Sequence, residues 1–289
     1  MNQQAQRQWT IQAILQWTIT YFEAKGIQNP RLTAEVLLAH VLRKERLYLY
    51  THYDQPLEAA ERAHFKSLLK QRVQGTPTQY LTGKQEFWSL TFHVAPGVLI
   101  PRPETEHLVE AASKLAAQFP KPAIVDIGVG SGAIAISLKK ERPQADVYAG
   151  DLSDAALTIA RQNASRLLNG DNAIIFRRGD LLQPFAGIAF DLIVSNPPYI
   201  SAAEYAALAR EVREHEPKIA LYGGAAGLDV YQRLIAAAPA HLQPGGYVLV
   251  EIGYGQKDPV VGIFQQHGFI IRQMIKDYAQ IDRVIVAQQ

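Results

Sequence analysis

Cysteine is absent from this chain of 289 residues. Its absence excludes disulfide scaffolds, cysteine nucleophiles and zinc or iron–sulfur centres held by thiolates. Long apolar runs are also missing, because no stretch approaches the roughly 20 residues that a membrane-spanning helix needs. The histidines between His93 and His267 show no metal-ligand spacing. We therefore expect a cytoplasmic protein with no membrane segment and no bound metal.

Charge is scarce and unevenly spread. Charged residues make up 19% of the chain, and the net charge is only +2. The segment up to Gln85 contains 11 Lys/Arg against 6 Asp/Glu, so it carries +5 and the remainder −3. The basic first segment could face an acidic partner or nucleic acid, or simply be a solvated surface. The acidic remainder argues against a basic groove for a nucleic-acid substrate.

The periodicity of apolar residues changes along the chain. Residues 1–84 read as amphipathic helices of a small bundle, broken at Gly26 and at residues 54–56, with Gly75 closing the third helix. Residues 85–101 alternate like a β-hairpin linker with its turn at Pro96-Gly97. In residues 102–289, strands and helices alternate, and two strands close the chain. The pattern predicts an α/β fold: a seven-stranded Rossmann-like sheet, covered on both faces and ending in an antiparallel hairpin, with an N-terminal helical bundle.

A glycine-rich turn follows the first strand of this sheet, in the sequence VDIGVGSGAIAI. Gly128, Gly130 and Gly132 let the backbone turn sharply and approach a ligand without a Cβ between them. The spacing differs from the dinucleotide motif, whose helix N-terminus holds a pyrophosphate. Here the helix N-terminus could face a carboxylate, and Asp126 could accept from an ammonium group. The turn therefore suits a ligand with an amino-acid head group; the alternative is a tight turn that serves helix packing only.

Acidic residues end the next two strands. Asp151 is placed to accept both hydroxyls of a ribose, and the glycine turn before it favours this interpretation; the alternative is an N-terminal charge on the next helix. Asp180 and Leu181 could bracket an adenine, or be ordinary loop residues. An adenosine that carries an amino-acid tail is S-adenosylmethionine, which becomes S-adenosylhomocysteine when its methyl group is transferred.

The fourth strand ends in the sequence SNPPY. The side-chain Oδ1 of Asn196 and the carbonyl of Pro197 can each accept one N–H of a planar NH2 group. Pro198 has no N–H that could compete, and the ring of Tyr199 can stack on the planar group. Two acceptors would orient the nitrogen toward a methyl donor and stabilise the positive charge that develops on it. The alternative is a β-bulge or a rigid strand exit without chemistry.

Together, DIGVGSG and NPPY resemble the amino methyltransferases that modify planar NH2 groups. Three further phrases, PTQYLTGKQEFW, VLIPRPETE and EVREHEPKIALYGGAAGLDVY, are similar to the peptide-chain release factor glutamine methyltransferases. The resemblance covers nearly the whole chain. It implies methylation of the glutamine in the Gly-Gly-Gln loop of class I release factors, with a helical N-terminal domain that grips the release factor. A ribosomal-protein glutamine and a nucleic-acid exocyclic amine remain alternative substrates.

The resemblance also implies residue roles. Asn196, Pro197, Pro198 and Tyr199 would hold the glutamine amide, and residues 102–105 would line the site as a cover strand. The family usually has Thr and an aromatic residue where this chain has Val129 and His215. The cofactor would contact Glu104, Thr105, Asp126, Gly128, Val129, Gly130, Ser131, Gly132, Asp151, Asp180, Leu181 and Asn196.

Overall fold

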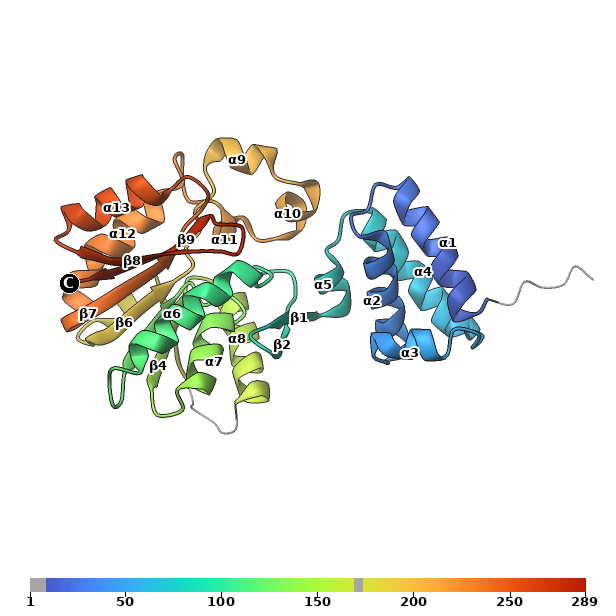
Figure 1. The fold of residues 1–289 in the computed structure, drawn as a ribbon, viewed down its shortest axis with the longest axis horizontal. Helices are drawn as coiled ribbons and strands as arrows, with labels where there is room; N and C mark the ends of the chain where they lie inside the picture. The colour runs from blue at the N-terminus through green and yellow to red at the C-terminus, as the bar shows by residue number, and fades with distance from the viewer. Residues whose placement is uncertain (1–8, 169–173) are drawn as a thin grey trace, which may run out of the picture. The chain divides into compact units, whose positions relative to one another are not determined.

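A computed structural model describes residues 9–168 and 174–289. The chain forms two compact units, Met1–Gly83 and Lys84–Gln289 (Figure 1). No helix among the described residues is long and apolar enough to cross a membrane.

The first unit is a helical bundle. Its apolar core includes Phe22, Leu37, Leu38 and Phe65, all fully buried. The first helix, α1, begins at a side-chain cap, because the Thr10 hydroxyl oxygen accepts from the Ala13 N–H. The unit consists of α1 (Ile11–Ala24), α2 (Pro30–Leu42), α3 (Arg46–Thr51), α4 (Ala59–Val73) and α5 (Thr78–Thr82).

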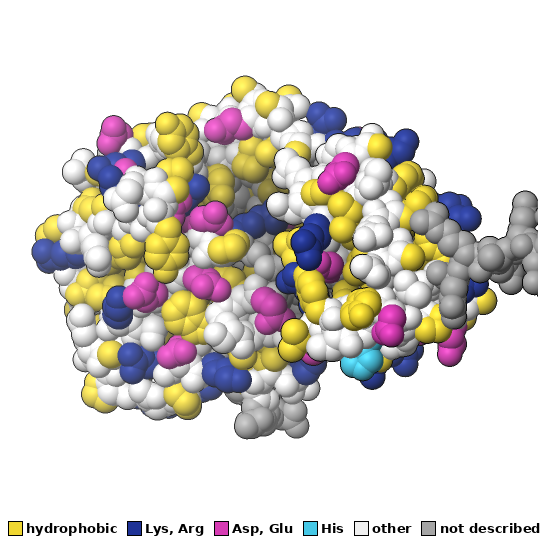
Figure 2. All heavy atoms as spheres, turned by 45° about the vertical axis from the view of Figure 1, so that its right-hand side comes forward, with side chains coloured by type: hydrophobic (Ala, Val, Ile, Leu, Met, Phe, Trp, Pro, Cys, Tyr) yellow, Lys and Arg dark blue, Asp and Glu magenta, His cyan; other side chains and the backbone are white. Residues whose placement is uncertain are grey.

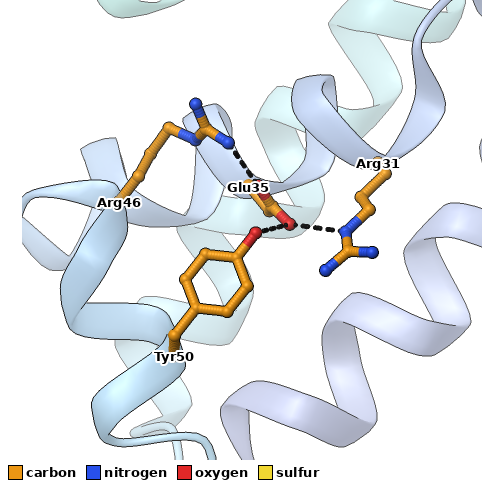
Figure 3. Close-up of polar contacts among 4 residues, drawn as sticks. All are labelled: Arg31, Glu35, Arg46 and Tyr50. Carbon is orange, nitrogen blue, oxygen red and sulfur yellow. Dashed lines mark hydrogen bonds and ion pairs between the residues drawn. The ribbon is translucent and has the colours of Figure 1, made fainter.

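A buried carboxylate ties α2 to α3 in this bundle (Figure 3). Glu35 is only 3% exposed, and it accepts hydrogen bonds from Arg31 at 2.9 Å, Arg46 at 2.7 Å and the Tyr50 hydroxyl at 2.6 Å. Burial alone raises the pKa of Glu35, but the bonds from Tyr50, Arg46 and Arg31 outweigh it and lower the pKa. Glu35 is therefore a charged, fully bonded tie between two helices.

The second unit opens with an antiparallel hairpin of β1 (Lys84–Phe87) and β2 (Leu90–His93). The hairpin was predicted, but the position of its turn was wrong. Trp88 and Ser89 form the turn with φ of 51° and 56°, whereas Pro96-Gly97 lies beyond the second strand. A turn with two successive positive φ values matches the right-handed twist of the strands. Trp88 and Ser89 therefore adopt it, although their side chains disfavour a positive φ.

The sheet of the second unit has seven strands in the order β5-β4-β3-β6-β7-β9-β8. The five strands β3 to β7 run parallel to one another. Strand β9 lies between β7 and β8 and is antiparallel to both. This confirms the predicted fold class. The strands are β3 (Ala123–Ile127), β4 (Asp146–Asp151), β5 (Ile174–Arg178), β6 (Phe190–Ser195), β7 (Leu242–Glu251), β8 (Ile270–Lys276) and β9 (Asp282–Gln288).

Helices cover both faces of this sheet, as Figure 1 shows. One apolar core lies under α6 (Glu106–Ala116), α7 (Ala133–Glu141) and α8 (Asp154–Leu167), and the other under α12 (Asp229–Ala237) and α13 (Lys257–Gln266). In β3, Ile124 joins the first core, while Val125 and Ile127 join the second. Burial on both faces explains why the strands are almost continuously apolar.

Short helical segments fill the connections. They are the 3-10 turns η1 (Pro103–Thr105), η2 (Gln183–Phe185) and η3 (Ala238–His241), and the helices α9 (Ala202–Ala207), α10 (Arg210–His215) and α11 (Lys218–Leu221). The predicted cover strand at residues 102–105 was wrong, because Pro103 starts a 3-10 turn that leads directly into α6. Proline suits the first position of a helical turn, where its missing N–H costs nothing.

Candidate active site

The glycine turn lies between β3 and α7, at the point where the strand order reverses. Gly128, Gly130 and Gly132 have φ of 79°, 53° and 87°, which side chains rarely adopt. The carbonyl of Gly150 in β4 accepts from the Gly128 N–H at 2.8 Å. A Cβ on Gly128 would meet no atom within 4 Å, whereas one on Gly132 would lie 2.7 Å from Ile136. Gly132 therefore serves helix packing, and Gly128 faces open space.

That space is a cavity of about 480 Å³ at the carboxyl ends of β3, β4, β5 and β6. Its volume is in the range of small-molecule sites, and its position at the switch point is where parallel sheets bind ligands. The described residues that line it are Gly97, Val98, Leu99, Ile127, Gly128, Gly130, Gly150, Asp151, Leu152, Ser153, Ala156, Gly179, Asp180, Leu181, Asn196, Pro198, Lys218, Ile219, Ala220, Tyr222, Val230 and Arg233.

Asp151 lies on the cavity wall at the end of β4. Its Oδ2 accepts from the Gly130 N–H at 3.0 Å, and its Oδ1 accepts from the Ser153 N–H at 2.9 Å. These bonds fix the carboxylate between the glycine turn and the start of α8. Burial raises the pKa of Asp151, although the N–H groups of Gly130 and Ser153 act to lower it. The carboxylate is thus held in place while still reaching the cavity.

Asp180 and Leu181 lie on the cavity wall after β5. Leu181 adopts a positive φ of 49°, unusual for a branched residue. Asp180 forms an ion pair with Arg233 of α12, which also lines the cavity. The turn therefore presents an apolar side chain next to a fixed carboxylate.

Several predicted cofactor residues lie behind the wall. Asp126 is 1% exposed, and its Oδ2 accepts from the Ala135 N–H at 3.0 Å, within the first turn of α7. Burial, helped by the nearby Asp151 carboxylate, raises the pKa of Asp126 to about 7, although the Ala135 N–H acts to lower it. None of the other five lines the cavity among the described residues; Val129, Ser131, Gly132 and Thr105 are buried and Glu104 half-buried.

The NPPY segment leaves the sheet beside the glycine turn. The Ser195 hydroxyl donates to the Ile127 carbonyl at 2.7 Å, which fastens the end of β6 to the end of β3. Asn196 and Pro198 reach the cavity, whereas Pro197 is buried and Tyr199 half-buried. The Asn196 side-chain Nδ2 donates to the Thr105 hydroxyl at 3.1 Å. The structure thus brings Asn196 and the glycine turn to one cavity.

The backbone of NPPY is held from its other side by the segment after α11. The Ile200 N–H donates to the Leu221 carbonyl at 2.9 Å, and Gly223 N–H donates to the Ile200 carbonyl at 2.9 Å. A Cβ on Gly223 would lie 2.5 Å from the Pro198 carbonyl oxygen. Only glycine at 223 therefore allows the two segments to approach this closely.

Comparisons with known proteins agree with this geometry. The family described as PrmC N-terminal domain matches residues 13–83, and that described as Methyltransferase small domain matches residues 102–218. A release factor glutamine methyltransferase of Geobacter sulfurreducens is 45% identical over 277 residues, 96% of each chain. This chain belongs to the release factor glutamine methyltransferase family. Relatives of that name from Koribacter versatilis and Rhodopirellula baltica are 41% and 38% identical; each aligns with 97% of this chain, and with 99% and 97% of its own length.

The fold itself has a match among solved structures. A methyltransferase from Pyrococcus furiosus superposes with a TM-score of 0.51 at 17% identity, covering 69% of this chain and 88% of that chain. This likeness concerns the arrangement of the sheet and its helices.

Sequence reasoning missed three site residues of this family member. Glu251, at the end of β7, accepts from the Thr105 hydroxyl at 2.6 Å. Glu216 accepts from the Ile100 N–H at 3.1 Å and from Arg102 at 2.5 Å, and so fixes the segment that leads into η1. Gly223 backs the NPPY carbonyls. The sequence that contains Glu216 and Gly223 resembles the family, but its spacing alone indicates no role for either residue. For Glu251, the only feature in the sequence is its position at the end of a strand.

Proposed function

We propose that this protein transfers a methyl group from S-adenosylmethionine to the side-chain amide nitrogen of the glutamine in the Gly-Gly-Gln loop of class I release factors. The observation that carries the proposal is the shared cavity. Asn196 and Pro198 line the same space as Gly128, Gly130 and Asp151, so an amide and a methyl donor can meet there. Family membership over nearly the whole chain supports the substrate.

The residues present fit the methyl donor. Gly128 and Gly130 leave free the space that a Cβ would fill, so a ligand can lie against the backbone. The Asp151 carboxylate, fixed by two N–H groups, suits ribose hydroxyls, and Leu181 beside Asp180 suits the adenine. When bound, S-adenosylmethionine supplies a methyl group on a positively charged sulfur, and the electrons of the broken S–C bond stay on that sulfur.

The chain's own residues orient the accepting amide. In this proposal, Asn196 Oδ1 on the cavity wall accepts one N–H of the glutamine NH2. The backbone carbonyl of the buried Pro197 accepts the other, so the nitrogen points along the line of transfer. Tyr199 packs beside the planar group, and burial raises its pKa, which keeps its hydroxyl neutral. As the N–C bond forms, the two oxygens stabilise the growing positive charge until one N–H proton leaves to water.

The partner and its location follow from this proposal. The expected partner is a protein, since Lys/Arg and Asp/Glu side chains are intermixed on the face of the larger unit seen in Figure 2, with no basic stripe on that face. We therefore expect no direct nucleic-acid substrate and no membrane contact. Because release factors act in translation, we expect the protein in the cytoplasm.

The test is mass spectrometry of purified release factors, ribosomal proteins and DNA after incubation with the enzyme and a labelled methyl donor. We expect one added methyl on the glutamine of the Gly-Gly-Gln peptide. Asn196→Ala should lower turnover at least about 100-fold, because an oriented acceptor is lost, while release factor binding stays close to wild type. Label on a ribosomal protein or DNA instead would replace the proposed substrate, and full turnover by the variant would refute the role of Asn196.

A further inference from the structure

Three side chains from separate parts of the sequence form a hydrogen-bonded series that ends at the cavity. Glu251 ends β7 and is 2% exposed; Thr105 lies in η1 and is 4% exposed. The Thr105 hydroxyl donates to Glu251 Oε2 at 2.6 Å and accepts from Asn196 Nδ2 at 3.1 Å. Of the three, only Asn196 lines the cavity.

This series has a direction. An ionised carboxylate can only accept, so Thr105 must use its single hydroxyl proton on Glu251. The Thr105 hydroxyl oxygen can then only accept a hydrogen bond from Asn196. Only the NH2 end of the Asn196 amide can satisfy them, and the Oδ1 end must point the other way. The two ends of an amide have nearly the same shape, so such a network is what decides between its two orientations.

We propose that Glu251 and Thr105 are positioning residues that set the orientation of the Asn196 amide, so that Oδ1 faces the accepting nitrogen. The inference rests on the proposed function, because an NH2 substrate needs an acceptor at this position. With the amide reversed, the Asn196 NH2 group would face the substrate NH2 group, and neither can accept. The substrate amide would then lose one of its two hydrogen bonds. Glu251 and Thr105 thus act through Asn196 and need not touch the substrate.

Protonation of Glu251 would remove the fixed direction of the hydrogen bonds from Asn196 through Thr105 to Glu251. Burial raises the pKa of Glu251 to about 7, against the hydrogen bond from Thr105, the charge of Arg283 and the nearby Asn196 amide, which all act to lower it. Below that pH the protonated carboxyl can itself donate to Thr105, whose own proton is then free to turn toward Asn196. Turnover should therefore rise as pH increases through about 7. The charged and titratable groups around this carboxyl are Arg283 of β9, Glu104 of η1, Tyr199 and Tyr231.

The kinetic test compares substitutions of matched shape. Thr105→Val should lower kcat on release factor about 10- to 100-fold, with KM for the methyl donor unchanged. Its melting temperature should also fall, because the buried Glu251 carboxylate loses a donor. Thr105→Ser keeps the hydroxyl and should restore kcat. Thr91→Val is the control, because it removes a surface hydroxyl that donates to Glu86 at the same 2.6 Å. Glu251→Gln can present either end of its amide, so its kcat should fall and lose the rise near pH 7.

A second measurement does not depend on turnover. With asparagine labelled in its side-chain nitrogen, the Asn196 NH2 signal is identified by its loss in Asn196→Ala. We expect protection from hydrogen exchange and a cross-peak to the Thr105 methyl group in the wild type, with the protection lost in Thr105→Val. Equal exchange in the two proteins, or wild-type kcat in Thr105→Val, overturns the inference. A wild-type enzyme that leaves release factors unmodified refutes the proposed function instead, and the exchange result still decides the inference.

Discussion

Two buried carboxyl groups link the site to the stability of the fold. Burial raises the pKa of Asp126 from an ordinary 3.8 to about 7, and that of Glu251 from 4.5 to about 7. The folded state therefore binds more protons than the unfolded state between these values, so stability falls as pH rises from about 4 to about 7. Each group contributes roughly 3 to 4 kcal/mol of this loss, at about 1.4 kcal/mol per pKa unit, with Asp126 the larger.

Denaturant unfolding of the ligand-free protein at pH 5 and pH 8 measures this effect. Asp126→Asn keeps the oxygen that accepts from the Ala135 N–H, and Glu251→Gln keeps the shape of its side chain. Each variant should lose part of the fall in unfolding free energy between the two pH values. A variant whose pH dependence matches the wild type would mean that its carboxyl is already ionised below pH 5 in the folded protein.

At the scale of elements, the glycine turn needs a left-handed backbone and must also leave space for the methyl donor. Substitutions can separate these two requirements. Gly128→Ala and Gly187→Ala place a methyl group at the same φ of 79° with no atom within 4 Å, but only Gly128 lines the cavity. Both should lose about 1 to 2 kcal/mol of stability from the left-handed backbone. Only Gly128→Ala should also weaken binding of the methyl donor in calorimetry, because its methyl group enters the cavity.

Gly132→Ala should affect stability more than it affects binding of the methyl donor. Its Cβ would lie 2.7 Å from Ile136 and 3.4 Å from Ala160, so it should lower the melting temperature more than either of the other two variants. Methyl-donor affinity that falls equally in Gly128→Ala and Gly187→Ala would show that backbone strain, and not the cavity, accounts for the loss.

The elements also show where sequence reasoning succeeds. The alternation of strands and helices, the closing strand pair and the cavity-lining Gly128, Asp151 and Asn196 follow local patterns, and local patterns predicted them. The hairpin turn was misplaced because Trp88 and Ser89 carry no turn signature, whereas Pro96-Gly97 does. The strand at residues 102–105 was implied by the family resemblance, whereas Pro103 starts a 3-10 turn, as a proline at the first position of a helical turn favours.

At the scale of the whole molecule, the contacts that sequence could not supply join residues far apart in the chain. Thr105 and Glu251 meet although 146 positions separate them, and Ile100 and Glu216 meet across 116. Without the strand order, nothing in the sequence pairs an acid that ends β7 with a hydroxyl before α6. The family resemblance assigned Thr105 to the cofactor; in the structure its hydroxyl accepts from Asn196, and it is not among the described residues that line the cavity.

The division into two units leads to the last prediction. The described residues that line the cavity run from Gly97 to Arg233, all within Lys84–Gln289. A protein consisting of residues 84–289 should therefore bind the methyl donor with the affinity of the full chain. Its turnover on intact release factor should fall by at least about tenfold in kcat/KM, a loss of about 1.4 kcal/mol of transition-state binding, because the basic helical unit that would hold the partner is gone. Unchanged kcat/KM would mean that the larger unit alone selects the substrate, whereas weaker binding of the methyl donor would mean that the helical unit also supports the cavity.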